Sequence, residues 1–253
     1  MANLHLQSTS ANNQWYLEPL GRVLAANELD QLKRNWPPSH GQYLLELGNN
    51  LFLNKIETSR PTHKMTFCQN LITGQRLTMV LGDYSQLPFP SSSLDIVLSP
   101  HILEFEDDLA ASLEESWRVV ADDGYLIILG FNPWSLWGLK RLLAWHTHTY
   151  FPWHKHYQSG EKLRGLLIGM GAEIVLYKNL FFRPPINNIN FLTKTRWLEN
   201  IMPFLFPAMG GVYLLVAKKC VVPLVPIKPH WRWQSVLEPK GFAEPTTRRS
   251  RCD

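Results

Sequence analysis

The sequence of 253 residues lacks the features that mark several common protein classes. Its three cysteines, Cys68, Cys220 and Cys252, are far apart, odd in number and without metal or redox spacing. We therefore expect a reducing compartment and a cytoplasmic location. The first residues lack a basic start followed by an apolar core, so we expect no signal peptide. The longest apolar stretch, 201–217, contains two prolines and two adjacent glycines, which favours a helix, a turn and a buried strand over a membrane span.

The sequence also has no strong excess of charge of one sign. It carries 25 Lys and Arg against 21 Asp and Glu, a net charge of +4, and its basic residues are scattered until the last few positions. We therefore expect no nucleic-acid partner. Hydrophobic residues make up 45% and charged residues 18%, so the chain has enough apolar side chains for a sizeable core.

The segment 77–133 has the clearest pattern in the chain. Apolar runs at 77–81, 94–98 and 125–129 each end in small or polar residues, and an amphipathic helix from 109 to 120 lies between the last two. Short unbroken apolar strands beside such a helix are typical of a parallel sheet covered on both faces. In an open sheet of this kind, ligands bind outside the carboxyl ends of the strands. We therefore expect a ligand site formed by the residues that follow each strand.

Further elements lie on both sides of this segment. We predict a first crossover that is short or irregular, because the gap from Asn50 to His63 barely reaches the minimum of roughly 10–12 residues. Ser159 is a candidate helix cap, Gly171 ends that helix, and 179–194 is expected to be a loop. The other predicted elements are helices at 21–36, 159–170 and 197–206, and strands at 43–47, 63–68, 173–177 and 212–217.

These elements give the expected domain organisation. We predict a loose terminus at 1–14, one α/β domain at 15–218 and an irregular tail at 219–253. Within the domain, 133–157 is rich in Trp and His and is expected to be an inserted lid.

Several motifs at these positions resemble one enzyme family. Gly82-Asp83 is followed by the run Leu87-Pro88-Phe89, by Ser93-Leu94-Asp95-Ile96-Val97 and by His101-Ile102-Leu103-Glu104, and then by Arg118-Val119-Val120 and Asp123-Gly124-Tyr125-Leu126-Ile127. This order is similar to that of class I S-adenosylmethionine-dependent methyltransferases, and the continuation FNPWSLWGL resembles the YafS-like bacterial subset. The strong match covers roughly 83–133, and a weaker one covers 41–48 and 159–218.

The resemblance implies a fold and a cofactor. The fold is a Rossmann-like class I methyltransferase sandwich, with a mostly parallel seven-stranded sheet whose last strand is antiparallel. The cofactor is S-adenosyl-L-methionine, held at the strand ends. The candidate cofactor-binding residues are Glu46, Gly48, Asn49, Gln69, Asp83, Tyr84 and Ser99.

Asp83 matches the family acid that accepts from the adenine amino group, and the alternative is an aspartate that stabilises the turn after Gly82. Two departures from the family bear on the cofactor. The run after Glu46 and Gly48 lacks the family's later glycines. No suitable acid follows the second strand, and Gln69 could substitute because its amide oxygen accepts hydrogen bonds.

The sequence offers one candidate catalytic residue, His101, for substrate contact or proton removal. The alternative is a hydrogen-bonded structural histidine. Trp134, Trp137 and Trp153 could form an aromatic lid over the site, and a lid of this kind suits an apolar acceptor and contact with a membrane surface. The spacing of His146, His148, His154 and His156 is not a known ligand pattern, so we expect no metal.

Two functions are compatible with these observations. The first is methyl transfer to a small apolar or aromatic acceptor, for which the enzyme positions a nucleophile in line with an already activated methyl donor. The second is a non-catalytic member of the fold that serves as a binding or interaction module. The missing glycines and the missing ribose acid motivate the second function, whereas the order of the motifs favours the first.

Overall fold

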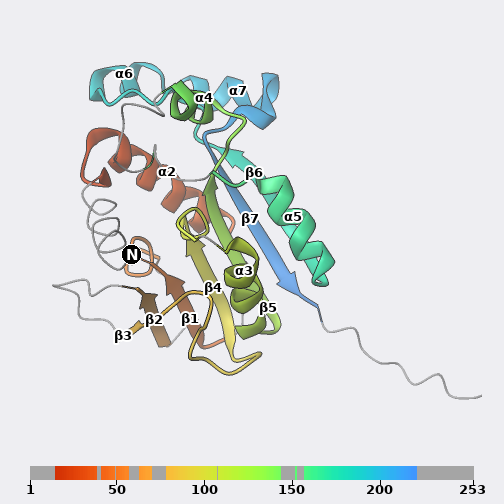
Figure 1. The fold of residues 1–253 in the computed structure, drawn as a ribbon. Helices are drawn as coiled ribbons and strands as arrows, with labels where there is room; N and C mark the ends of the chain where they lie inside the picture. The colour runs from red at the N-terminus through yellow and green to blue at the C-terminus, as the bar shows by residue number, and fades with distance from the viewer. Residues whose placement is uncertain are drawn as a thin grey trace, which may run out of the picture. The chain divides into compact units, whose positions relative to one another are not determined.

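A seven-stranded sheet lies at the centre of the computed structural model (Figure 1). The strands, in sheet order, are β3 (Thr78–Leu81), β2 (His63–Cys68), β1 (Tyr43–Leu47), β4 (Leu94–Pro100), β5 (Val120–Phe131), β7 (Val212–Lys219) and β6 (Ala172–Leu180). The first five strands are parallel, and β7 runs antiparallel to β5 and to β6. This arrangement confirms the predicted sheet.

The structure describes residues 15–38, 41–48, 50–56, 63–69, 78–106, 108–143, 152 and 157–220. All of them belong to one unit, 1–221, and the second unit, 222–253, lies outside this range. The predicted loose terminus at 1–14 is also outside the described residues. Between β1 and β2, residues 50–56 form turns and no helix, in agreement with the irregular first crossover.

Strand β5 is longer than predicted. The apolar run that predicts it covers 125–129, but β5 begins at Val120 and includes Asp122, Asp123 and Gly124. They form a bulge, because Leu94 pairs with Val120 while Ile96 pairs with Tyr125. Asp123 has a φ of 60°, a left-handed conformation that aspartate tolerates better than most residues.

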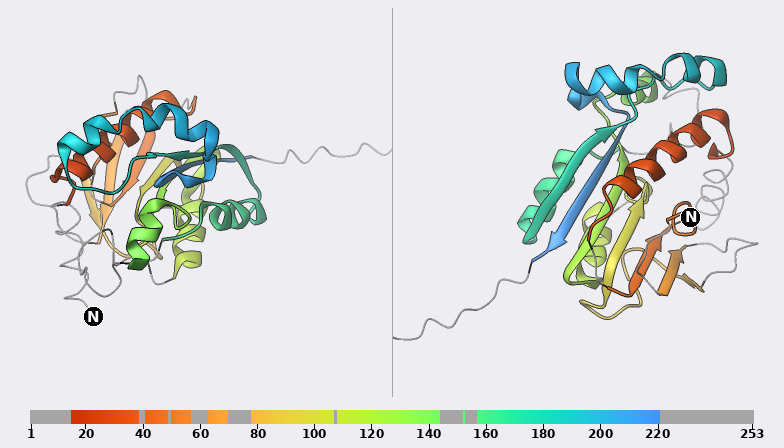
Figure 2. Two further views of the ribbon diagram at one scale, coloured as in Figure 1. Left: turned by 90° about the horizontal axis from the view of Figure 1, so that it is seen from above. Right: turned by 180° about the vertical axis from the view of Figure 1, so that it is seen from behind.

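Helix α2 (Pro19–Arg34) covers one face of the sheet and lies in front of it in the right-hand view of Figure 2. It begins with a proline at its first turn, where the missing N–H costs nothing. The fully buried stripe has a spacing of four residues and consists of Leu20, Leu24, Glu28 and Leu32.

Helices α3 (Leu109–Val119) and α5 (Gly160–Gly169) cover the other face. The Asp108 carboxylate caps α3 by accepting from Ala111 N at 3.0 Å, and Trp117 Nε1 donates to Met170 O at 3.2 Å. Ser159 occupies the predicted N-cap position of α5, but its side chain makes no capping hydrogen bond. Leu163 and Leu167 of α5 are fully buried, whereas Leu166 is 37% exposed.

Three short helices lie beyond the carboxyl ends of β4 and β5 (Figures 1 and 2). They are α4 (Leu136–Leu143), α6 (Ile189–Lys194) and α7 (Leu198–Leu205), with the 3-10 turn η1 (Pro207–Met209) after α7. The predicted loop at 179–194 is therefore wrong at both ends, because β6 continues to Leu180 and α6 begins at Ile189. Within the described ranges, no helix has the length and apolar character that a membrane span requires.

Candidate functional site

The register of the parallel strands brings their carboxyl ends to one edge of the sheet. Gly48 N donates to Phe67 O at 2.7 Å, and Gly82 N donates to Cys68 O at 3.1 Å. Gly48, Gln69 and Asp83 therefore follow three neighbouring strands side by side. Ser99 lies at the end of β4, which pairs with β1 on its other edge. These residues lie where an α/β sheet binds its ligand.

Glu46 is fully buried and holds the turn that follows β1. Its Oε1 accepts from Leu51 N at 2.7 Å and from Phe52 N at 3.2 Å, and its Oε2 accepts from Leu53 N at 2.6 Å. Burial raises the pKa of Glu46 to about 7, although these three backbone donors and Lys55 lower it. The carboxylate thus fixes the backbone of 51–53 from within, and a ligand would meet that backbone before the carboxylate.

Gly48 follows directly and has a φ of 100°, which favours glycine. A Cβ at this position would collide with Ile102 Cδ1, so the side chain after β4 packs against the end of β1. Asn49, the next predicted cofactor residue, lies outside the described residues.

Asp83 is exposed at the end of β3. Its Oδ1 accepts from Ser85 N at 2.9 Å. This is the contact expected if Asp83 stabilises the turn after Gly82. A carboxylate has about four lone-pair sites, so this bond leaves capacity for a further donor. Tyr84 and Leu87 are buried beside it, and Tyr84 packs edge-on to Phe67 at 5.7 Å between ring centroids.

Gln69 is half-buried at the end of β2, and its amide group has a partner that sequence reasoning missed. Gln69 Nε2 donates to Glu106 Oε1 at 3.1 Å. Since β2 and β4 flank β1, the segment after β4 reaches across the end of β1 to make this bond.

His101 lies in a buried cluster of charged groups. Its Nε2 lies 2.9 Å from Glu28 Oε1, and its Nδ1 lies 3.4 Å from Glu104 Oε1. Burial by itself lowers the pKa of His101, but the two carboxylates override this effect and raise it to about 10. With both ring nitrogens facing carboxylates, His101 has the geometry of the structural alternative and offers no nitrogen to a substrate.

The backbone and surroundings of His101 agree with this reading. Its φ is 56°, and its N donates to Leu129 O at 2.8 Å. Its ring lies 4.4 Å from the Phe131 ring, and Glu104 Oε1 also accepts from Phe131 N. Burial raises the pKa of Tyr16 well above its usual value, and the nearby carboxylates of Glu28, Glu104 and Glu46 raise it further.

Ser99 lies at the end of β4 and has a buried hydroxyl. It is 1% exposed, and no group among the described residues hydrogen-bonds its Oγ. A buried hydroxyl without a partner is costly unless a ligand or water completes its hydrogen bonds.

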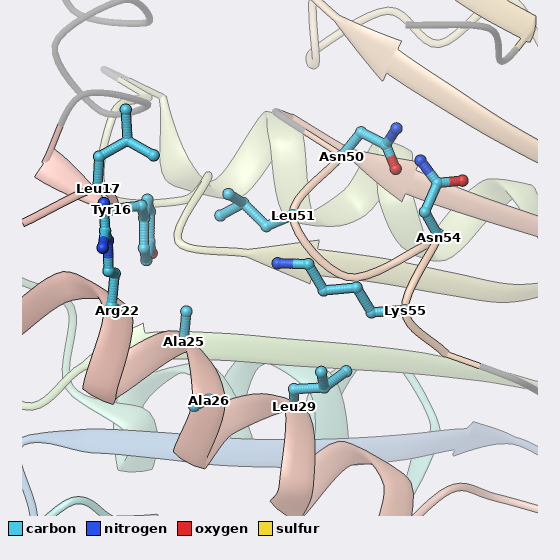
Figure 3. A pocket seen from close by; sticks show the side chains of 10 residues that line it. All are labelled: Tyr16, Leu17, Arg22, Ala25, Ala26, Leu29, Asn50, Leu51, Asn54 and Lys55. Atoms are coloured by element: carbon cyan, nitrogen blue, oxygen red, sulfur yellow. The ribbon is translucent and has the colours of Figure 1, made fainter.

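A cavity of about 570 Å³ opens between α2 and the turn after β1 (Figure 3). Its volume is within the range of small-molecule sites. Tyr16 forms part of its wall and connects it to the buried carboxylates described above. The lining combines aliphatic side chains with two cations and two amides: Tyr16, Leu17, Arg22, Ala25, Ala26, Leu29, Asn50, Leu51, Asn54 and Lys55.

The three tryptophans predicted to form a lid have different environments. Trp137 is 1% exposed, stacks on Phe131 at 5.5 Å between ring centroids and donates from Nε1 to Arg183 O at 3.1 Å, so it is a core residue. Trp134 is 78% exposed and could cover a ligand. Trp153 and the four histidines at 146, 148, 154 and 156 lie outside the described residues.

Comparison with known proteins agrees with this geometry. Residues 39–128 match the family model of the methyltransferase domain. This segment of the chain is similar to a methyltransferase domain. This domain spans β1 to most of β5 and includes all the strand ends described above. S-adenosylmethionine is the cofactor that the domain implies.

Similar proteins extend the match beyond the methyltransferase domain. The chain is 28% identical over 218 residues to YafS of Escherichia coli, a protein of uncharacterised function, and the alignment covers 86% of this chain and 85% of YafS. It is 30% identical over 79 residues to malonyl-[acyl-carrier protein] O-methyltransferase 1 of Coxiella burnetii, over 30% and 28% of the two chains. An S-adenosylmethionine-dependent methyltransferase from Thermotoga maritima has the same fold, with a TM-score of 0.57, 20% identity and coverage of 82% and 94%.

The residues of the methyltransferase domain fit an adenosyl cofactor at the adenosine end. Asp83 presents an exposed carboxylate beside the buried Tyr84 and Leu87, and Ser99 has an unsatisfied hydroxyl. At the turn after β1 the fit rests on Gly48 and on the backbone of 51–53, because the family's later glycines are missing. These are the groups available to hold the cofactor.

Proposed function

We propose that the chain transfers a methyl group from S-adenosylmethionine to a small acceptor whose reacting part is apolar or aromatic. The observation that carries this proposal is the alignment of Gly48, Gln69, Asp83 and Ser99 along one edge of the sheet. When bound, S-adenosylmethionine supplies a methyl group already activated by its sulfonium. The protein then has to bind, orient and exclude water, which requires no catalytic triad and no metal.

Each strand end has a role in this proposal. Asp83 accepts from the adenine amino group while Oδ1 keeps its bond to Ser85 N. Tyr84 and Leu87 form the apolar wall beside it. The Ser99 hydroxyl gains a partner, and Gly48 gives the ligand close access to the backbone. His101 is a positioning residue that holds the end of β4 against α2 through Glu28.

The cavity beside α2 supports the acceptor class. Its aliphatic side, which includes Leu29 and Leu51, suits an apolar molecule of modest size. Arg22 and Lys55 line the same cavity and would favour an acceptor that also carries an acidic group. Trp134 is the lid candidate among the described residues, because Trp137 is committed to the core and Trp153 lies outside that range.

The helices beyond the strand ends support contact with an anionic membrane surface. We name as the apolar end face the exposed side chains Trp134, Leu142, Leu143, Phe204, Leu205 and Phe206 of α4, α7 and their flanks. Exposed Lys194 and Arg196 lie just before α7. Glu199, the acid of α7, is paired with Arg183 at 3.2 Å. Aromatic and aliphatic side chains beside cations are typical of interfacial binding to anionic lipids.

A second function is favoured by one specific observation. The carboxylate of Glu46 is engaged by three backbone amides, and Ile102 packs on Gly48, so the turn after β1 is stabilised from within the chain. A non-catalytic methyltransferase-fold protein that serves as a binding or interaction module would have the same features.

Cofactor binding separates the two functions. S-adenosylhomocysteine at about 100 times its dissociation constant should raise the free energy of unfolding by roughly 2.7 kcal/mol, seen as a higher melting temperature. Asp83→Ala should weaken the affinity for S-adenosylhomocysteine by about tenfold. This affinity is measured by isothermal titration, because the variant also loses the Ser85 contact and its melting temperature would change for that reason alone. Asp30→Ala, an exposed acid on α2 paired with Arg34, is the control. If neither S-adenosylmethionine nor S-adenosylhomocysteine binds the unmodified protein, the methyltransferase proposal fails.

A further inference from the structure

The methyltransferase domain lacks the acid that the family places after its second strand. Between Glu46 and Asp83 the sequence contains one acid, Glu57, which lies outside the described residues. Gln69 stands at the end of β2 instead. An amide accepts hydrogen bonds from the two ribose hydroxyls more weakly than a carboxylate does. A carboxylate at the end of β2 would therefore have to come from another part of the chain.

Glu106, which is distant in sequence, brings a carboxylate close to the end of β2. It lies six positions after Pro100, the last residue of β4, and it is half-buried. Its Oε1 accepts from Gln69 Nε2 at 3.1 Å, although the two residues are 37 positions apart. Because β1 lies between β2 and β4, the carboxylate stands over the end of β1, next to the position where the family's acid would be.

The second carboxylate oxygen is also fixed. Ser112 Oγ, on the first turn of α3, donates to Glu106 Oε2 at 3.1 Å. The two donors are neutral and come from different elements, β2 and α3. Together they fix the orientation of the carboxylate.

A third element reaches the same place. Tyr84 is buried, and burial raises its pKa, with the charges of Cys68 and Glu106 raising it further. Tyr84 follows β3 beside Asp83, the candidate adenine contact. Glu106 is thus located among the residues that follow β2 and β3, on the adenosine side of the strand ends.

We propose that Glu106 is the acid that accepts the hydrogen bonds of the cofactor's ribose hydroxyls, in place of the missing acid after β2. This inference rests on the proposed cofactor binding. A carboxylate can accept from two neighbouring hydroxyls at once. Gln69 then acts as the residue that positions Glu106.

Removing one ribose hydroxyl from the ligand tests this assignment. We would measure by isothermal titration the affinities of the full chain for 5′-methylthioadenosine and for its 2′-deoxy analogue. The unmodified protein should bind the deoxy compound about tenfold more weakly. Glu106→Gln should bind 5′-methylthioadenosine about tenfold more weakly and should discriminate little between the two compounds. Glu114→Gln, an exposed acid on the same helix as Ser112, is the control and should keep the full discrimination.

A crystal structure of the unmodified protein with S-adenosylhomocysteine provides a second test that does not depend on the folding of a variant. It should place a Glu106 oxygen within about 2.5–3.2 Å of a ribose hydroxyl. A structure in which Gln69 alone contacts the ribose, or a Glu106→Gln variant with undiminished discrimination, overturns the assignment of Glu106 while leaving the proposed function intact. Absence of binding to the unmodified protein overturns both.

Discussion

His101 Nε2 lies 2.9 Å from Glu28 Oε1, and this contact joins the end of β4 to helix α2 across 73 positions of sequence. Both side chains are almost fully buried, with exposures of 3% and 0%. Breaking a buried ion pair by removing one partner leaves the other charge without compensation. The stability of the fold therefore depends on His101, the residue that the sequence offers as a candidate catalytic base.

We predict that His101→Gln lowers the free energy of unfolding by about 3 kcal/mol, because Glu28 and Glu104 then share a buried site without a cation. The double variant Glu28→Gln with His101→Gln should recover part of this loss, since it removes one of the buried charges. Urea unfolding followed by circular dichroism measures both. His63→Gln, at the exposed start of β2, is the control and should change stability by less than about 0.5 kcal/mol. A loss below about 1 kcal/mol for His101→Gln would contradict the ion-pair reading.

Stability should also fall as pH rises. The pKa of His101 is raised to about 10 in the folded protein, whereas an unfolded histidine titrates near about 6.5. Between these values the folded state binds more protons than the unfolded state, so the stabilisation is complete below about pH 6.5 and is lost as the pH approaches about 10. Glu46 acts in the same direction from about pH 4.5 to about 7, because burial raises its pKa.

Urea unfolding at a series of pH values measures this dependence. The free energy of unfolding should decline steadily from mildly acid to alkaline pH. The decline above about pH 6.5 should be much smaller in His101→Gln, while the part due to Glu46 should remain. A flat profile between about pH 6.5 and 10 in the unmodified protein would show that His101 is neutral in the fold.

The apolar end face gives a third prediction. Phe204 and Leu205 are 88% and 63% exposed at the end of α7. The unmodified protein should sediment with vesicles that contain phosphatidylglycerol and remain free of vesicles made of phosphatidylcholine alone, because cations accompany the apolar side chains. Phe204→Ser combined with Leu205→Ser should abolish this binding. Ile168→Ser, an exposed apolar side chain on α5, should leave it unchanged. Equal binding by all three proteins would remove the end face from membrane contact.

Much of the fold could be predicted because each strand is a short apolar run with polar residues at its ends. The bounds predicted for β1 and β2 are those of the structure. Helix α6 was missed because Pro184, Pro185 and several asparagines around it favour a loop. Its cap is an asparagine: Asn188 Oδ1 accepts from Asn190 N at 3.0 Å, a cap that a stretch so rich in turn residues does not single out.

The candidate site could be predicted where it depends on position along a strand, and less well where it depends on contacts between distant residues. Gly48, Gln69 and Asp83 follow strands and Ser99 lies at the end of one, so the sheet brings them together. Glu28 was missed although it lies between Leu24 and Leu32 at helical spacing, because an acid within an apolar stripe reads as a solvent-facing residue. Trp137 was assigned to a lid because local patterning cannot show that Phe131 and Arg183 enclose it.

The position of β7 determines when the sheet can be completed as the chain is synthesised. Strand β7 is the last strand in sequence, yet it lies between β5 and β6, and β6 pairs with no other strand of the described sheet. Until residues 212–219 leave the ribosome, the edge of β5 and both edges of β6 have no partner. Domains with unpaired strand edges are prone to aggregation during synthesis. The growing chain therefore exposes this half of the sheet longest, and chaperones would have to protect it until the final strand inserts.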